Sequence, residues 1–154
     1  MPRFLLGSLT RYYAENGGVG DSHLEADLEV IAGAVSAWRH WLNKELPHAL
    51  DWDESPTAPF DATAVGETEW AALCQAAGNP DQLTKPTLWL PGEHDFLFQV
   101  RDLREELRWI GSAAELLREL QTINPEEVGA ETALGALQAH ARRSVLFRLP
   151  LVRD

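Results

Sequence analysis

Cysteine is almost absent from this chain of 154 residues. Cys74 is the only one, so no intramolecular disulfide and no zinc site built from several thiolates can form. The chain also lacks a run of 18 apolar residues, so we expect no membrane-spanning helix. Gly7, Ser8 and Arg11 break the N-terminal apolar run, which is then too short for the core of a signal peptide. These absences favour a cytoplasmic protein.

Sequence motifs that carry chemistry are missing too. There is no Gly-x-Ser-x-Gly elbow, no Gly-x-x-x-x-Gly-Lys loop and no Gly-x-Gly-x-x-Gly turn. Asp51, Asp53 and Glu54 are not followed by the glycine and the bidentate glutamate that a calcium loop needs. No His-Glu-x-x-His or His-x-His pattern occurs among the five histidines, which are His23, His40, His48, His94 and His140. We therefore expect no metal and no cofactor.

Positive charge is scarce as well. Thirteen Lys and Arg stand against 24 Asp and Glu, which gives a net charge of −11 and an isoelectric point near 4.8. A nucleic-acid binder needs cationic surface, and so does a protein that binds anionic membranes, so both classes of partner are disfavoured. An acidic protein instead attracts a basic partner. Lys44 and Lys85 are the only lysines, which together with the alanine content indicates a bacterial source with a GC-rich genome.

The composition is that of a globular protein, with 45% apolar and 24% charged residues. At this length we expect one domain over residues 1–154. The clearest element is a helix over 22–46, because one apolar stripe recurs at spacings of three and four, formed by Leu24, Leu28, Ile31, Val35, Trp38 and Leu42. Pro47 ends that helix, and residues 47–66 resemble a long acidic loop.

The remaining segments alternate between short strands and capped helices. The residues between Leu90 and Phe96 suit a hairpin loop, so we expect 87–90 and 96–100 to pair with each other. Ser112 and Glu115 form a capping box that starts a helix. The other expected elements are a strand at 3–9, helices at 67–77, 102–110 and 131–143, and a strand at 144–149, with one longer helix as the alternative at the end. Their sum predicts an α+β fold, with a small and mainly antiparallel sheet and helices on one face.

The acidic loop supplies the candidate binding site. Between Glu45 and Glu69 there are seven carboxylates and no Lys or Arg, so this segment carries a formal charge of −7. Aromatic side chains surrounded by like charge are typical of a surface that binds a basic protein, since the charges speed encounter and the aromatics supply buried anchors. The candidate interface residues are Asp51, Trp52, Asp53, Glu54, Phe60, Asp61, Glu67 and Glu69.

Two other functions remain open. The first is a small enzyme that uses His94 with Asp95, since neighbouring carboxylates raise the pKa of a histidine and suit it to acid–base work. The second is a scaffold or homodimer that buries Trp41 or Trp109. Cys74 lies in an acidic, alanine-rich helix, and we expect it to be packed in the core rather than reactive.

Three short segments carry a resemblance. They are Leu88-Trp89-Leu90-Pro91, Gly111-Ser112 and Leu116-Leu117-Arg118-Glu119-Leu120. Together they resemble segments in immunity-type families of bacterial polymorphic toxin systems. That resemblance implies an acidic protein that neutralises one basic toxin domain by direct binding, and it carries no site residues across.

Overall fold

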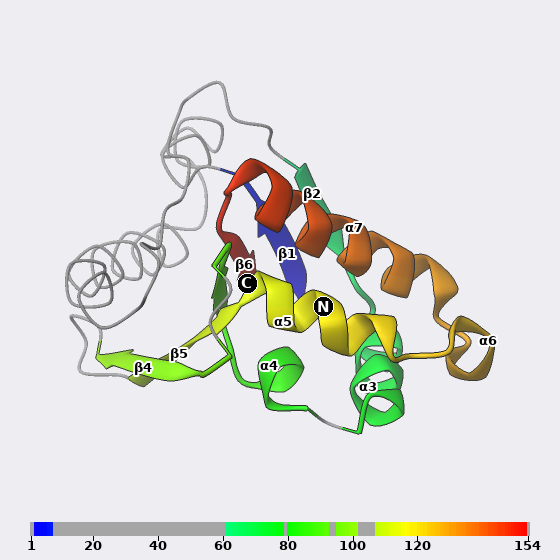
Figure 1. Cartoon of the computed structure of the whole chain (residues 1–154). Coiled ribbons are helices and arrows are strands. Elements are labelled where there is room, and N and C mark those ends of the chain that lie inside the picture. The colour runs from blue at the N-terminus through cyan, green and yellow to red at the C-terminus, as the bar shows by residue number, and fades with distance from the viewer. Residues whose placement is uncertain (1, 8–60, 79, 93–94, 102–106, 154) are drawn as a thin grey trace, which may run out of the picture.

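The computed structural model describes residues 2–7, 61–78, 80–92, 95–101 and 107–153, which form one six-stranded sheet and the helices packed on it (Figure 1). The strands are β1 (Arg3–Leu6), β2 (Asp61–Ala64), β3 (Leu88–Leu90), β4 (Phe98–Arg101), β5 (Leu107–Ser112) and β6 (Leu151–Arg153). The helices are α3 (Glu67–Ala76), α4 (Asp81–Thr84), α5 (Ala113–Gln121), α6 (Pro125–Val128) and α7 (Glu131–Phe147). The fold is α+β, as the pattern of elements predicts.

The sheet has the strand order β2-β1-β6-β3-β5-β4. Four of its five pairings are antiparallel, and β3 with β5 is the parallel one. The strand at the C-terminal end of the described chain, β6, therefore lies in the middle of the sheet, between the first strand and β3. The mainly antiparallel sheet is confirmed, and it includes a parallel pair that local sequence patterns do not encode.

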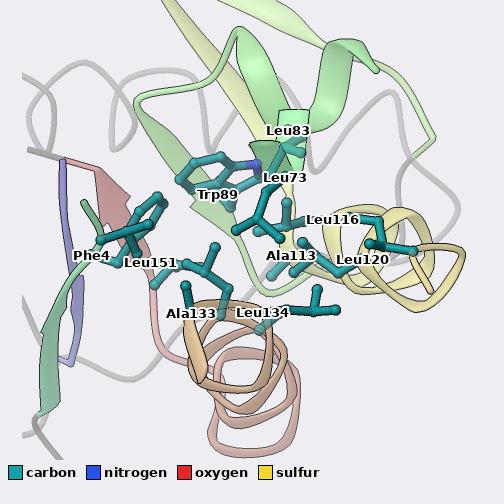
Figure 2. Close-up of a cluster of buried hydrophobic side chains, with 14 of the residues drawn as sticks. Phe4, Leu73, Leu83, Trp89, Ala113, Leu116, Leu120, Ala133, Leu134 and Leu151 are labelled. Carbon is teal, nitrogen blue, oxygen red and sulfur yellow. The ribbon is translucent and has the colours of Figure 1, made fainter. Parts of the chain in front are cut away.

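A single hydrophobic core fills the space between the sheet and the described helices. Phe4, Trp89 and Leu151 point from the strands toward α5 and α7, which lie side by side over the sheet (Figures 1 and 2), and Leu6 belongs to the same core. Trp89 is fully buried, and its Nε1 donates a hydrogen bond to the carbonyl oxygen of Gln82 at 2.6 Å. Burial of each large apolar side chain here contributes roughly 1.5–3 kcal/mol relative to exposure.

The helix predicted at 67–77 is confirmed as α3, and Cys74 is a buried free thiol in the core, as expected. The capping box at Ser112 is confirmed in its hydroxyl half, because Ser112 Oγ accepts a hydrogen bond from the backbone N–H of Glu115 at 3.3 Å. The predicted helix over 22–46 lies outside the described residues, and so does most of the loop predicted at 47–66.

The loop prediction is wrong at its end, where Asp61–Ala64 forms β2. Ala62 and Ala64 are exposed, so this edge strand has no apolar alternation from which it could be recognised. Its backbone pairs with β1, and that partner, rather than its own side chains, makes it a strand.

The predicted hairpin between 87–90 and 96–100 is also wrong. β3 pairs with β5 and β6, whereas β4 pairs with β5. β3 is the three-residue sequence Leu-Trp-Leu and is buried throughout, which is typical of a central strand with a neighbour on each side. A short connection on its own does not decide which strands become neighbours.

Residues 107–110 are not helical, contrary to the prediction for 102–110; they belong to β5, and 102–106 lie outside the described residues. The spacing of Leu107 and Ile110 is helical, but Leu107 is 50% exposed and Ile110 is 0% exposed. Residues 107–110 form a strand because β5 pairs with β3 on one side and with β4 on the other, and this pairing outweighs the local helical spacing.

The final predicted strand, 144–149, is wrong, and the alternative of one longer helix is correct. α7 runs to Phe147, and Arg148 ends it in the left-handed conformation, with φ of 55°. Ser144 Oγ donates a hydrogen bond to the carbonyl oxygen of Leu149 at 2.6 Å, which closes the turn into β6. The alternation of Val145, Phe147 and Leu149 therefore reflects a helix followed by its cap.

A substitution at Gly111 tests how tightly α4 packs on the sheet. A Cβ atom at Gly111 would lie 2.6 Å from Gln82 Oε1 and 2.7 Å from Pro86 Cγ. We predict that Gly111→Ala lowers the free energy of unfolding by about 1–3 kcal/mol, measured by urea denaturation. Gly135→Ala in α7 is the matched control, because its Cβ would meet nothing within 4 Å, and it should stabilise the chain by about 0.5–1 kcal/mol. Equal effects of the two substitutions would contradict this packing.

Candidate partner-binding site

The structure describes three of the eight candidate interface residues. Asp61 begins β2, and Glu67 and Glu69 lie in the first turn of α3. The other five lie outside the described residues: Asp51, Trp52, Asp53, Glu54 and Phe60. The described part of the candidate site is therefore its C-terminal end, where the chain passes from the edge strand into α3.

Asp61 has a partner within the protein. Its Oδ2 accepts from the Arg143 guanidinium of α7, and its Oδ1 accepts from the backbone N–H of Ala62 at 2.9 Å. Both side chains of the ion pair are nearly half exposed, so the pair that links β2 to α7 adds little to stability. A basic partner would compete with Arg143 for this carboxylate.

Glu67 and Glu69 are exposed at the start of α3. Their position suits the helix, because carboxylates in the first turn are stabilised by the unpaired backbone N–H groups there. No side chain caps this end, since Gly66 is the N-cap residue. The two carboxylates thus stabilise the helix locally and present negative charge to solvent.

The fold adds carboxylates that the sequence-based site missed. Glu126 and Glu127 occupy the first turn of α6, and Glu131 occupies the first turn of α7. All three are exposed, and α6 and α7 both contact α3 (Figure 1). Three helices that contact one another therefore each begin with exposed carboxylates. The pair of adjacent glutamates was visible in the sequence, but its proximity to α3 was not.

Charge is distributed unevenly along the chain. The residues that the structure describes include ten Asp and Glu and nine Lys and Arg, so this part is almost neutral. The whole chain has a net charge of −11. Nearly all of the excess negative charge is therefore carried by 8–60, 93–94, 102–106 and 154, and the first of these segments contains most of the candidate interface.

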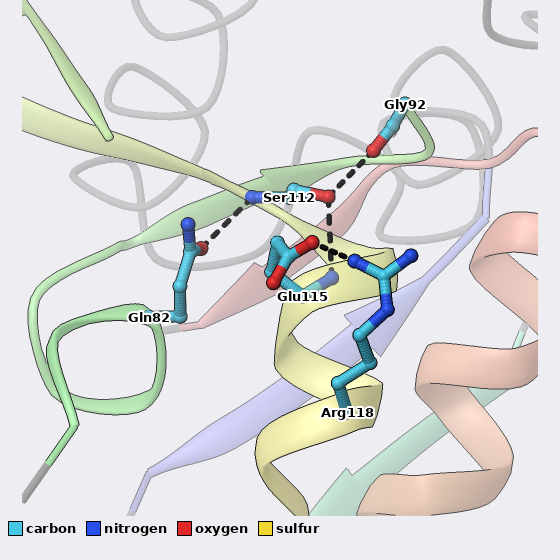
Figure 3. A network of polar contacts seen from close by, with 5 residues as sticks. All are labelled: Gln82, Gly92, Ser112, Glu115 and Arg118. Carbon is cyan, nitrogen blue, oxygen red and sulfur yellow. Dashed lines mark hydrogen bonds and ion pairs between the residues drawn. The ribbon is translucent and has the colours of Figure 1, made fainter. Parts of the chain in front are cut away.

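A polar network fixes the start of α5 against the sheet (Figure 3). Ser112 Oγ donates to the carbonyl oxygen of Gly92 at 2.5 Å, and the Ser112 backbone N–H donates to Gln82 Oε1 at 3.0 Å. Glu115 does not reach back to the N–H of Ser112, as a full capping box would require, and instead accepts from Arg118. The network joins α4, the end of β3, β5 and α5 at one point.

Glu119 of α5 connects α5 to α4. The backbone N–H groups of Gln82 and Leu83 donate to its carboxylate, which supplies the side-chain cap that α4 lacks at Pro80. Burial raises the pKa of Glu119 to about 7, the two backbone hydrogen bonds oppose that rise, and the charge of Asp81 adds to it. Such a pKa suits acid–base chemistry, but the contacts of this carboxyl are with backbone amides in a helix–helix contact.

His140 and Cys74 are buried titratable groups whose pKa values are shifted as well. Burial lowers the pKa of His140 most, while the Ala136 carbonyl and Asp61 oppose the shift and Arg143 adds to it. The ring Nδ1 lies 3.0 Å from the carbonyl oxygen of Ala136, which makes Nδ1 the protonated nitrogen of a neutral ring. Burial also raises the pKa of the Cys74 thiol, which disfavours the nucleophilic thiolate.

The residues of the alternative functions are only partly described. Asp95 is exposed, and His94 lies outside the described residues. Trp109 is partly buried, with Lys85 Nζ 5.0 Å from its ring centroid, and Trp41 lies outside the described residues. Among the described residues no group of three or more His, Cys, Asp or Glu is placed to hold a metal ion. None of the described helices has the length and apolar character needed to cross a membrane.

The chain was compared with protein-family models, with curated proteins and with solved structures, and none of them matches it.

Glu119 makes stability depend on pH. Its pKa is about 7 in the folded chain and about 4.5 when unfolded, so its contribution is full below pH 4.5 and is lost as pH rises through 7. We predict that Glu119→Gln, which stays neutral, gains stability relative to the parent chain as pH rises from 4.5 to 8, measured by urea denaturation. Glu126→Gln on exposed α6 controls for the loss of one carboxylate. A difference between Glu119→Gln and the parent that does not vary with pH would contradict this account.

Proposed function

We propose that this protein is an acidic protein-binding module, specifically a cytoplasmic bacterial immunity protein that neutralises a cognate toxin by one-to-one binding. The observation that carries the proposal is the separation of charge. The stretch from Glu45 to Glu69 contains seven carboxylates and no Lys or Arg, whereas the described residues outside it include seven Asp and Glu and nine Lys and Arg. A neutral framework that bears one strongly acidic segment suits recognition of a basic protein surface.

The described end of that segment fits such a role. Glu67 and Glu69 are exposed in the first turn of α3, and further exposed carboxylates stand in the first turns of α6 and α7, which both contact α3. Long-range attraction between unlike charges speeds encounter, while buried aromatic side chains slow dissociation. In this proposal Trp52 and Phe60 are the anchors, and the carboxylates, from Asp51 to Glu69, steer the approach of the toxin.

The direct test is affinity capture with the tagged full-length chain from the native organism's lysate, at low and at high salt. We expect one basic protein in near-equal amount, whose association slows as salt rises, because screening weakens attraction between exposed charges. Purified partner should then lose its own toxic activity when this chain is added. Absence of a stoichiometric partner at either salt would refute the proposal.

Two sets of substitutions separate anchoring from steering. We predict that Trp52→Ala raises the Kd for the captured partner by about 30-fold or more, chiefly through faster dissociation, as expected for an aromatic hot spot. The combined change Glu67→Gln with Glu69→Gln should instead slow association at low salt. At high salt its association rate should equal that of the parent chain. Both rates are measured by surface plasmon resonance. An unchanged Kd for Trp52→Ala would show that Trp52 is not part of the interface.

The same assay distinguishes the binding module from an enzyme. Asp95 is exposed and lies outside the acidic stretch, so Asp95→Asn should leave partner binding and neutralisation unchanged. If Asp95→Asn or His94→Gln abolishes the biological effect while the Kd stays the same, the chain acts as an enzyme. The two proposals therefore predict opposite results for one variant.

A further inference from the structure

The second face of the sheet is apolar and buried. Register alignment places one residue from each strand in a single row, from edge to edge: Ala62, Leu5, Val152, Leu88, Ile110 and Phe98. The four central side chains of this row are between 0% and 5% exposed, and Leu90 on the same face is 1% exposed. Buried apolar side chains in such a row require a layer of atoms above them.

The described helices do not supply that layer. Side chains of a strand alternate between faces, so Phe4, Leu6, Trp89 and Leu151 point away from the row. These four belong to the core that α3, α4, α5 and α7 join through Leu73, Leu83, Leu116 and Leu134, and Val128 of α6 packs against it. Leu5, Leu88, Leu90, Ile110 and Val152 do not belong to that core. Within the described part of the chain, helices therefore lie on one face.

The chain between β1 and β2 starts and ends at the edge of this sheet. Leu6 and Asp61 are paired neighbours in adjacent antiparallel strands, although more than fifty residues separate them in sequence. Two to five residues are enough to join such strands, so this connection is far longer than a turn. Both of its ends are held next to Leu5, at one side of the apolar row.

The same connection contains the apolar stripe of Leu24, Leu28, Ile31, Val35, Trp38 and Leu42. A helix over 22–46 would be about 37 Å long, at 1.5 Å per residue. Six strands at about 4.8 Å spacing give a sheet about 24 Å wide, so one such helix can cross every strand. Glu25 and Glu29 fall off the stripe, where they would face water.

We propose that the second face of the sheet is the docking surface for this apolar stripe, so that residues 22–46 form the third layer of an α/β/α sandwich. The occupant is a segment of the same chain, because the connection that contains it starts and ends at the edge of the sheet, where Leu6 pairs with Asp61. Docking brings the stripe onto Leu5, Val152, Leu88 and Ile110 and removes both apolar surfaces from water.

Cysteine labelling of adjacent residues on opposite faces tests the proposal. Val152→Cys reports on the second face and Leu151→Cys on the core face, each in full-length chain that carries Cys74→Ala. The stripe is disrupted by Ile31→Asp with Val35→Asp. Ala26→Asp with Ala37→Asp is the matched control, because both alanines lie on the side of the helix opposite the stripe.

We expect Val152→Cys to be protected in the parent chain and labelled about tenfold faster or more in the stripe variant, with Leu151→Cys little changed. In the control variant, Ala26→Asp with Ala37→Asp, both cysteines should stay protected from labelling. If the stripe variant exposes both cysteines, the milder Ile31→Ala with Val35→Ala replaces it and is judged in the same way.

Three results would overturn the proposal. The first is rapid labelling of Val152→Cys in the parent chain. The second is equal labelling in the stripe and control variants. The third is protection that falls on dilution, which would show that a second copy of the chain covers this face.

Discussion

The sheet is continuous because β6 pairs on both sides. Its three residues pair with β1 on one side, and Leu151 and Val152 pair with β3 on the other, so the first strand and the β3-β5-β4 group meet through β6. Arg153 reinforces this position, since its backbone N–H donates to Thr87 and its guanidinium to the Thr84 carbonyl oxygen. The same guanidinium lies 5.4 Å from the ring centroid of Trp70. Contacts so distant in sequence slow folding, because the loop-closure entropy must be lost before the contacts form. The core and both faces depend on closing this strand.

Polar side chains fix the angle between the sheet and α5. Gln82 accepts from the Ser112 N–H with its side chain and from the Trp89 indole with its carbonyl oxygen, while the Glu119 carboxylate caps the helix that contains Gln82. Buried polar groups of this kind cost free energy unless they are paired, so they select one arrangement of neighbours. Gly111 is required beside them because a side chain there would meet Gln82 and Pro86.

The near-neutral framework and the acidic segment suit different tasks. Ion pairs such as Arg143 with Asp61 and Arg118 with Glu115 lie at the surface of the described fold and balance its charge locally. The described residues are almost neutral, so nearly all of the net charge of −11 belongs to the rest of the sequence. We propose that the same separation lets one fold hold its shape while a connecting segment meets a basic partner.

Local patterns in the sequence were enough to predict the helices whose first residues are typical of a helix N-terminus. Glu67–Ala76, with its first-turn acids, and the helix that Ser112 caps were both predictable, and so were the buried Cys74 and the α+β class. Three of the candidate site residues could be placed on the fold, but the contribution of Glu126, Glu127 and Glu131 depended on helix packing. Only the tertiary structure decided that Asp61–Ala64 and Leu107–Ser112 are strands and that Leu88–Leu90 pairs with Leu151–Arg153. A strand acquires its hydrogen bonds from a partner remote in sequence, whereas a helix makes its hydrogen bonds within itself.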